Sequence, residues 1–156
     1  MTRWLSQEEQ VVWRSFLEAT RLLTEQLDRE LQQDAGLSHA DYEVLVRLSE
    51  AEGRAMRMSD LADRSQSSRS RLSHTVARME AAGWVRRESC PTDGRGAFAV
   101  LTDRGFEALA AAAPGHVEAV RTHLFDQLSG DEVAQLGVAS KAILDHLTCL
   151  EQRQRS

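Results

Sequence analysis

The side chains best suited to chemistry in this sequence are arginines and hydroxyl groups, and they are concentrated between residues 61 and 85. That stretch, LADRSQSSRSRLSHTVARMEAAGWV, holds four arginines and six serine or threonine residues. Arginine binds oxyanions through parallel hydrogen bonds, and serine and threonine hydroxyls can donate to the same oxygens. The pattern therefore indicates a surface for a polyanion, most simply double-stranded DNA.

The distribution of charge supports this interpretation. The 156 residues carry a net charge of −5, yet residues 64–95 alone sum to +4 and the remainder to −9. An acidic body with one basic strip is typical of a dedicated anion-binding face. A solvated basic helix face without a partner is the alternative.

Catalytic and metal sites are not favoured by the residue spacing. The five histidines are scattered, and the nearest two, His116 and His123, would lie two turns apart on a helix. Cys90 and Cys149 are not spaced as a metal motif or a disulfide framework. We therefore expect no enzyme, no metal and no cofactor.

The start of the chain, MTRWLSQEEQ, lacks the basic and apolar regions of a targeting segment. No uninterrupted apolar run approaches the ~20 residues that a membrane span needs. These features predict a cytoplasmic protein without membrane association.

Apolar spacing and turn residues indicate a mainly helical chain. Spacings of three to four predict helices over about 6–33 and 38–51, which begin with the capping sequences SQEE and SHAD. A two-turn helix capped by Ser59 follows, and then a longer helix capped by Ser68 and closed by Gly83.

The pattern then changes to a β-hairpin. WVRRESC and AFAVL have strand character, EGRAMRM further upstream reads as a plain connection, and PTDGRG has turn chemistry. Thr102 is expected to cap a helix that kinks or breaks at Pro114 and continues to Leu128. A final helix after LSGDE has apolar residues at heptad-like spacing between Val133 and Leu150.

Two helices joined by a serine-rich turn and followed by a hairpin form a winged helix-turn-helix. Side chains near the start of its second helix reach base edges in a major groove about 12 Å wide. Arg71 and His74 are therefore the predicted base readers, and Ser68 and Arg69 the predicted phosphate contacts. The full predicted set on this helix is Ser68, Arg69, Ser70, Arg71, His74, Thr75 and Arg78.

The hairpin, or wing, also carries arginines that are placed to contact DNA. Arg86 and Arg87 precede the turn and Arg95 lies near its tip, where an arginine can enter a narrow minor groove. Asp93 is expected to cap the turn or hold Arg95 extended. Cys90 lies beside these arginines, whose charge favours the reactive thiolate, so redox regulation through Cys90 is an alternative.

The first and last helices carry more apolar surface than the central unit can cover. Association of two chains would cover it, and we predict a homodimer. A winged helix used only for protein interaction is a further alternative, although such a module would not need arginines on both helix and hairpin.

Residues 37–105 resemble the winged-helix core of the MarR family of bacterial transcriptional regulators. The similar elements are LS..DYEVL, LA before the turn, S.SRLSHTVARME..GWVRR, the P.D.R hairpin and V.LTDRG. The flanking helices match in kind. One departure is the hairpin tip, where family members often have consecutive basic residues and here Gly94 and Gly96 flank Arg95.

The resemblance implies a dimer on a pseudo-palindromic operator, with recognition helices ~34 Å apart and half-sites centred about 10 bp apart. It also implies repression that a small molecule relieves, because an effector that prefers another helix spacing lowers DNA affinity. The implied cleft takes aromatic acids or phenols. Its candidate residues are Trp13, Arg14, Phe16, His39 and Tyr42; plain core or interface packing of Trp13, Phe16 and Tyr42 is the alternative.

The sequence as a whole predicts one continuous domain of mainly α class, an α+β winged helix. Residues 37–102 are expected to form the winged helix-turn-helix DNA-binding region. Residues 1–36 and 103–156 are expected to form a helical dimerisation region.

Overall fold

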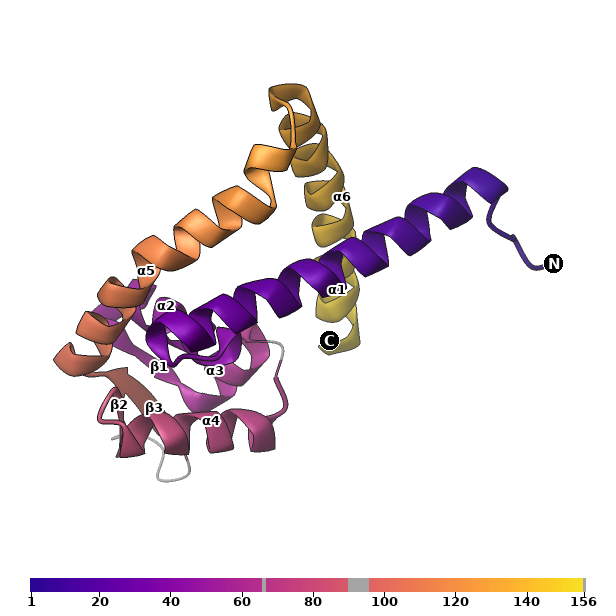
Figure 1. Ribbon diagram of the computed structural model, residues 1–156. Coiled ribbons are helices and arrows are strands. Elements are labelled where there is room, and N and C mark those ends of the chain that lie inside the picture. Colours follow the sequence, from indigo (N-terminus) through magenta and orange to yellow (C-terminus); the bar gives the residue numbers. More distant parts are fainter. Residues whose placement is uncertain (66, 90–95, 156) are drawn as a thin grey trace. The chain divides into compact units, whose positions relative to one another are not determined.

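The computed structural model describes residues 1–65, 67–89 and 96–155, in two compact units, Met1–Val117 and Glu118–Ser156. In chain order the elements of the first unit are α1 (Gln7–Ala35), α2 (His39–Glu50), the 3₁₀ turn η1 (Glu52–Arg54), β1 (Ala55–Arg57), α3 (Met58–Arg64), α4 (Arg69–Ala81), β2 (Val85–Ser89), β3 (Ala97–Leu101) and most of α5 (Asp103–His123) (Figure 1). The second unit contains the end of α5, the 3₁₀ turn η2 (Phe125–Gln127) and α6 (Gly130–Arg155). The predicted mainly α, winged-helix class is confirmed.

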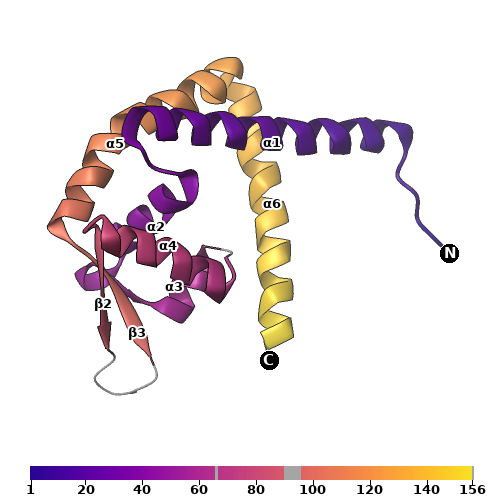
Figure 2. The ribbon, with the colours of Figure 1, turned by 60° about the horizontal axis from the view of Figure 1, so that its bottom comes forward.

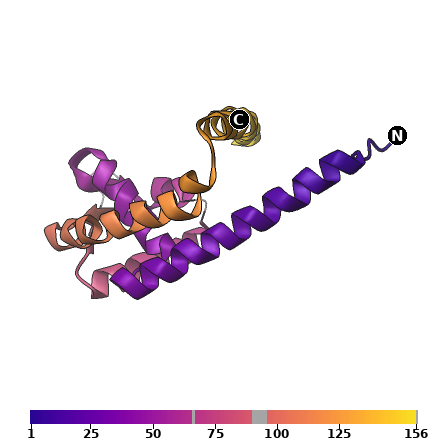
Figure 3. The ribbon, with the colours of Figure 1, turned by 45° about the horizontal axis from the view of Figure 1, so that its top comes forward.

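Helix α1 begins and ends with the local chemistry that its sequence predicts. The Ser6 hydroxyl accepts the backbone N–H of Glu9 at 3.1 Å, and the Glu9 carboxylate accepts that of Ser6 at 2.8 Å. Gly36, with φ of +65°, closes the helix in the left-handed region. Only Leu27 and Leu31 are buried, and the N-terminal half extends away from the rest of its unit (Figure 3).

Helix α4 has both predicted caps. The Ser68 hydroxyl accepts the backbone N–H of Arg71 at 3.1 Å. At the other end the backbone N–H groups of Gly83 and Trp84 donate to the carbonyls of Glu80 and Met79, with Gly83 at φ +76°. This pair of bonds is a Schellman motif, which needs a left-handed residue where glycine stands.

Ser59 does not cap α3, contrary to the prediction. The helix begins at Met58, Arg57 occupies the cap position, and no side chain there accepts a helix N–H. The reason is β1, a strand that the sequence did not predict and that leads directly into α3. Its three residues pair antiparallel with β3, in the sheet order β1-β3-β2.

The hairpin strands β2 and β3 pair antiparallel in register Arg86↔Val100 (Figure 2). The following helix, α5, is not broken at Pro114 as expected, but ends at His123 before η2. Pro114 and Ala110 are both exposed, so water can bond the carbonyl that proline leaves unpaired in the helix.

The core of the first unit fixes the helix-turn-helix against the sheet. Its members come from every α-helix and strand of the unit, among them Leu31, Leu45, Leu48, Met56, Leu61, Leu72, Val76, Met79, Val85, Ala99, Leu101 and Leu109. Gly105 lies so close to the chain that a Cβ there would approach the Trp84 carbonyl oxygen to 2.1 Å. Such packing sets the start of α5 directly against the segment that connects α4 to β2.

In the second unit, Ser129 and Glu132 form a further capping box at the start of α6. Across the described residues, no helix combines the length and apolar character that a membrane crossing requires.

Candidate nucleic-acid interface

The first turns of α4 present an exposed polar face. Ser68, Arg69, Ser70, Arg71 and His74 are all exposed. Neither Arg69 nor Arg71 has a carboxylate partner among the described residues. Two guanidinium groups without a counter-charge at the start of one helix are available for an external anion.

Thr75 is not part of that face. It is buried, at 7% exposure, whereas the sequence analysis placed it among the outward residues. Its position explains this, because Leu72, Thr75, Val76 and Met79 follow the spacing of one helical stripe and are all buried.

Arg78 is exposed at 62% but already has a partner within the protein. Its Nη2 donates to Oδ1 of Asp41 at 2.6 Å, and Asp41 has only 12% side-chain exposure. The Asp41 carboxylate also accepts the backbone N–H of Ser38 at 3.4 Å, in the cap of α2. The predicted DNA contact Arg78 therefore joins α4 to α2.

Arg87 similarly joins the wing to α4. Its Nε contacts Oε2 of Glu80 at 3.0 Å, and its Nη2 donates to the Ser73 carbonyl at 2.9 Å. Arg86 pairs with Glu88 at 2.7 Å on the same strand. Two of the three predicted wing contacts, Arg86 and Arg87, thus have carboxylate partners, and Arg87 also links the wing to α4.

Arg95 and Asp93 of the wing tip, and Cys90, lie outside the described residues. The predicted minor-groove contact and the redox alternative remain predictions from the sequence.

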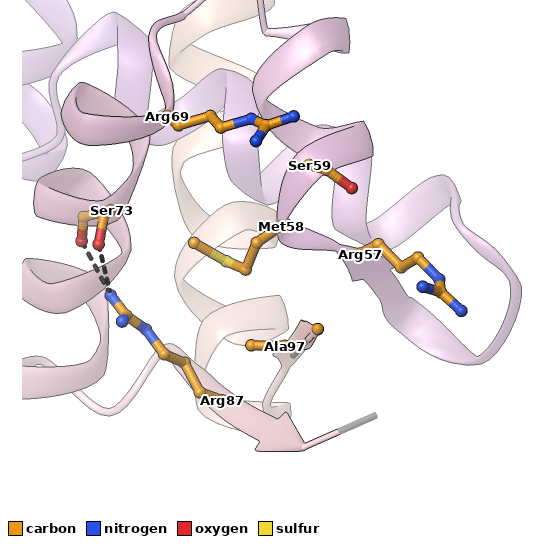
Figure 4. A pocket seen from close by; sticks show the side chains of 8 residues that line it. Arg57, Met58, Ser59, Arg69, Ser73, Arg87 and Ala97 are labelled. Carbon is orange, nitrogen blue, oxygen red and sulfur yellow. Dashed lines mark hydrogen bonds between the residues drawn. The ribbon is translucent and has the colours of Figure 1, made fainter. Parts of the chain in front are cut away.

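A cavity of about 430 Å³ lies between α3, α4 and the wing (Figure 4). Its lining includes Arg57, Met58, Ser59, Arg69, Ser73 and Arg87. Figure 4 shows Arg69 reaching from α4 toward the start of α3, and Arg87 reaching from β2 toward Ser73. Arg57 was not among the predicted contacts, because its only signal in the sequence is one of two arginines in a stretch that reads as a connection.

The predicted effector residues do not form one site within a chain. Trp13, Arg14 and Phe16 are exposed on the N-terminal half of α1. His39 lies instead beside the C-terminal half of α1. Its backbone N–H donates to Asp28 Oδ1 at 2.7 Å. From Trp13 to Asp28 the helix rises about 22 Å, at 1.5 Å per residue.

His39 and Tyr42 pack against His116 of α5, which the sequence analysis did not select. The ring centroids of Tyr42 and His116 are 4.5 Å apart, and those of His39 and His116 are 5.8 Å apart. Burial raises the pKa of Tyr42, and burial followed by the proximity of His39 lowers the pKa of His116. The Nδ1 atoms of both histidines are buried and have no hydrogen-bond partner among the residues that the structure describes.

Within the described part of the chain, no three His, Cys, Asp or Glu side chains are placed to hold a metal ion.

Comparison with known proteins identifies the family. The sequence model of the MarR family matches residues 35–96. The chain is similar to Sco3205, a MarR family transcriptional regulator from Streptomyces coelicolor solved in complex with DNA. The two share 52% identity over 94% of this chain and 92% of that chain, with a TM-score of 0.89. The chain belongs to the MarR family.

Two further comparisons accompany this assignment. The MarR family regulator AbsC, also from S. coelicolor, is 52% identical over 94% of this chain and 99% of that chain, with a TM-score of 0.86. A mutant MarR from E. coli, complexed with operator DNA, shares the fold at 22% identity and a TM-score of 0.76, over 85% and 93% of the two chains. No curated protein sequence matches the chain. Members of the MarR family are transcriptional regulators rather than enzymes, as the sequence predicts.

Proposed function

We propose that this MarR family protein, a DNA-binding transcriptional regulator, acts in the cytoplasm as a homodimeric repressor. It binds a pseudo-palindromic operator, and a small aromatic or phenolic effector releases it. The observation that carries DNA binding is the exposed start of α4, where Arg69 and Arg71 have no carboxylate partner among the described residues. Support also comes from the similar Sco3205 protein, which was solved in complex with DNA.

In this proposal the first turns of α4 enter the major groove. Arg71 and His74 read base edges, while Ser68, Arg69 and Ser70 contact phosphates. Arg78 and Arg87 act indirectly, since their bonds to Asp41 and Ser73 hold α4 and the wing in place. A preset distance between helix and wing reduces the ordering that binding would otherwise require.

Exposed apolar rows on α1 and α6 support the dimer. On α1 the exposed large apolar residues are Val11, Val12, Trp13, Phe16, Leu17 and Leu22. On α6 they are Val138, Ile143, Leu144, Leu147 and Leu150. A monomer in water would leave both rows exposed, whereas a second copy can cover them.

The effector is proposed to bind near His39, Tyr42 and His116. Two buried imidazole nitrogens that have no partner in the described part of the chain can hydrogen-bond a phenol or carboxylate, and the Tyr42 ring offers an apolar surface. Because this cluster joins α2 to α5, a bound effector can favour a dimer with another helix spacing and so lower operator affinity.

The test is a titration of the protein against DNA from upstream of its own gene, at two salt concentrations and with a panel of aromatic acids and phenols. We expect tight binding that weakens steeply with salt and that one compound releases. Replacing Arg69 and Arg71 together by glutamine should abolish it, whereas Arg29→Gln, which removes one charge from exposed α1, should not. Binding that ignores salt, or no binding at low salt, would favour a protein-interaction module instead.

The dimer has its own measurement. Sedimentation at micromolar concentration should give the mass of two chains, and Phe16→Glu should give the mass of one. Gln33→Glu, which adds the same charge to an exposed polar position of α1, should leave the dimer intact. A single-chain mass for the unaltered protein would contradict the proposed roles of α1 and α6.

A further inference from the structure

The cavity between α3, α4 and the wing has the character of an anion site. Three arginines, Arg57, Arg69 and Arg87, line it, and none of its described lining residues is acidic. Arg87 is neutralised by Glu80, but Arg57 and Arg69 have no carboxylate partner among the described residues. Positive charge therefore exceeds negative charge at this cavity.

The arrangement of these side chains keeps two guanidinium groups accessible. Figure 4 shows Arg69 reaching across from α4 toward Ser59, and Arg57 at the opposite rim with its guanidinium group directed outward, away from Arg69. The guanidinium carbon of Arg57 lies 5.5 Å from the centroid of the Phe98 ring. This cation–π contact restrains Arg57 while leaving its hydrogen-bond donors free for an anion.

The position of the cavity indicates which anion it takes. If α4 lies in a major groove and the wing in the adjacent minor groove, the sugar–phosphate strand that separates the two grooves must pass between them. The cavity occupies that place, bounded by α4 on one side and by β2 and β3 on the other. Its volume of about 430 Å³ has room for one phosphate group together with the sugars on either side of it.

We infer that this cavity is a seat for one backbone phosphate of the bound duplex, held by Arg57 and Arg69. The inference rests on the proposed DNA binding and adds Arg57 to the contacts that the sequence predicts. Ser73, whose carbonyl accepts from Arg87, lies on the wall of the seat, so the same bond that sets the wing also shapes the site. The seat fixes register and contributes no base preference.

The experiment measures the salt dependence of binding to a duplex of arbitrary sequence, because phosphate contacts do not depend on sequence. Each phosphate neutralised contributes about 0.9 to the slope of log affinity against log salt. Arg57→Gln and Arg69→Gln should each reduce the slope by about that amount for every seat engaged. Arg57→Lys, which keeps the charge, should restore it, and Arg29→Gln on α1 should have the wild-type slope. Thermal denaturation checks that each variant is folded.

The outcomes separate this inference from the proposed function. If the unaltered protein binds with a steep slope and Arg57→Gln has the slope of Arg29→Gln, the phosphate seat is wrong and DNA binding stands. If the unaltered protein does not bind duplex at low salt, the proposed function itself fails. A second arm titrates inorganic phosphate against the free protein. Binding of inorganic phosphate that Arg57→Gln removes, together with an unchanged salt slope of Arg57→Gln on duplex, would identify a site for free anions and overturn the backbone assignment.

Discussion

Arg78 and Asp41, 37 residues apart in sequence, form an ion pair of 2.6 Å that links the recognition helix to α2. Asp41 holds the guanidinium from a nearly buried position, while the arginine is still in contact with water. The sequence alone assigns Arg78 to DNA, because it lies on the polar side of α4. Because of the contact with Asp41, we propose that Arg78 positions the helix.

This role predicts coupling between the two residues. A double-mutant cycle with Arg78→Gln and Asp41→Asn should give a coupling of about 1 kcal/mol in the free energy of unfolding, measured by chemical denaturation. Asparagine keeps an oxygen for the cap of α2, so the cycle isolates the charge. The exposed pair Arg21 and Glu25 on α1 should couple by about 0.5 kcal/mol or less. Equal coupling of both pairs would remove the special role of Arg78.

DNA affinity distinguishes positioning from contact. If Arg78 contacted phosphate, Asp41→Asn would free it and strengthen binding. Since we assign it a positioning role, Asp41→Asn should weaken binding, and Arg78→Gln should leave the salt slope unchanged.

Arg71 is the residue for which a change of base preference is expected. Arg71→Ala should cost roughly 1–3 kcal/mol of binding free energy and relax the preference at one position per half-site. Arg95→Ala, at the wing tip, should weaken binding evenly across sequences. Selection from a randomised duplex library measures both. An equal loss on every sequence for the two variants would contradict base reading by Arg71.

The elements that the sequence predicts well are those whose chemistry is complete within a few residues. The capping box of Ser6 and the Schellman motif at Gly83 need only neighbours within five positions, so a local pattern specifies them. Strand β1 is different. Its three residues owe their conformation to β3, about 40 positions away, and no local period can show that.

The same distinction applies to the site. Residue types predicted the basic face, but not which arginines already have partners. Arg78 meets Asp41, and Arg87 meets the Ser73 carbonyl, only after the chain has folded. Arg57 became a candidate because α3, α4 and the wing enclose one cavity. The sequence does indicate that Thr75 is buried and not a DNA contact, since its spacing of three and four residues from Leu72 and Met79 places it on the apolar side of α4.

Two glycines allow a matched test of packing. A Cβ on Gly105 would lie 2.1 Å from the Trp84 carbonyl oxygen and 2.7 Å from Cδ1 of Leu101. Gly105→Ala should therefore lower the free energy of unfolding by about 1–3 kcal/mol or more. Gly137→Ala, in open space on α6, should raise it by up to about 1 kcal/mol, because alanine favours helix. Denaturation of both variants checks the prediction, which fails if Gly105→Ala is as stable as the parent.

His116 predicts how stability depends on pH. Burial, and secondly the neighbouring His39, hold its pKa below the ordinary value of 6.5. As the pH falls below 6.5, the unfolded chain therefore takes up a proton that the folded protein does not yet bind. The free energy of unfolding consequently decreases from about pH 7 down to the folded pKa, and below that pKa His116 adds no further slope.

Replacing His116 by glutamine removes this proton uptake from the folding equilibrium. Between about pH 7.5 and pH 5.5, the unaltered protein should lose more stability than His116→Gln, as measured by denaturation at each pH. His146→Gln, at an exposed position of α6, should keep the full dependence of the unaltered protein. If His116→Gln and the unaltered protein gave parallel curves, the imidazole of His116 would have to titrate alike in the folded and unfolded states. Its burial beside His39 and Tyr42 would then carry no charge penalty.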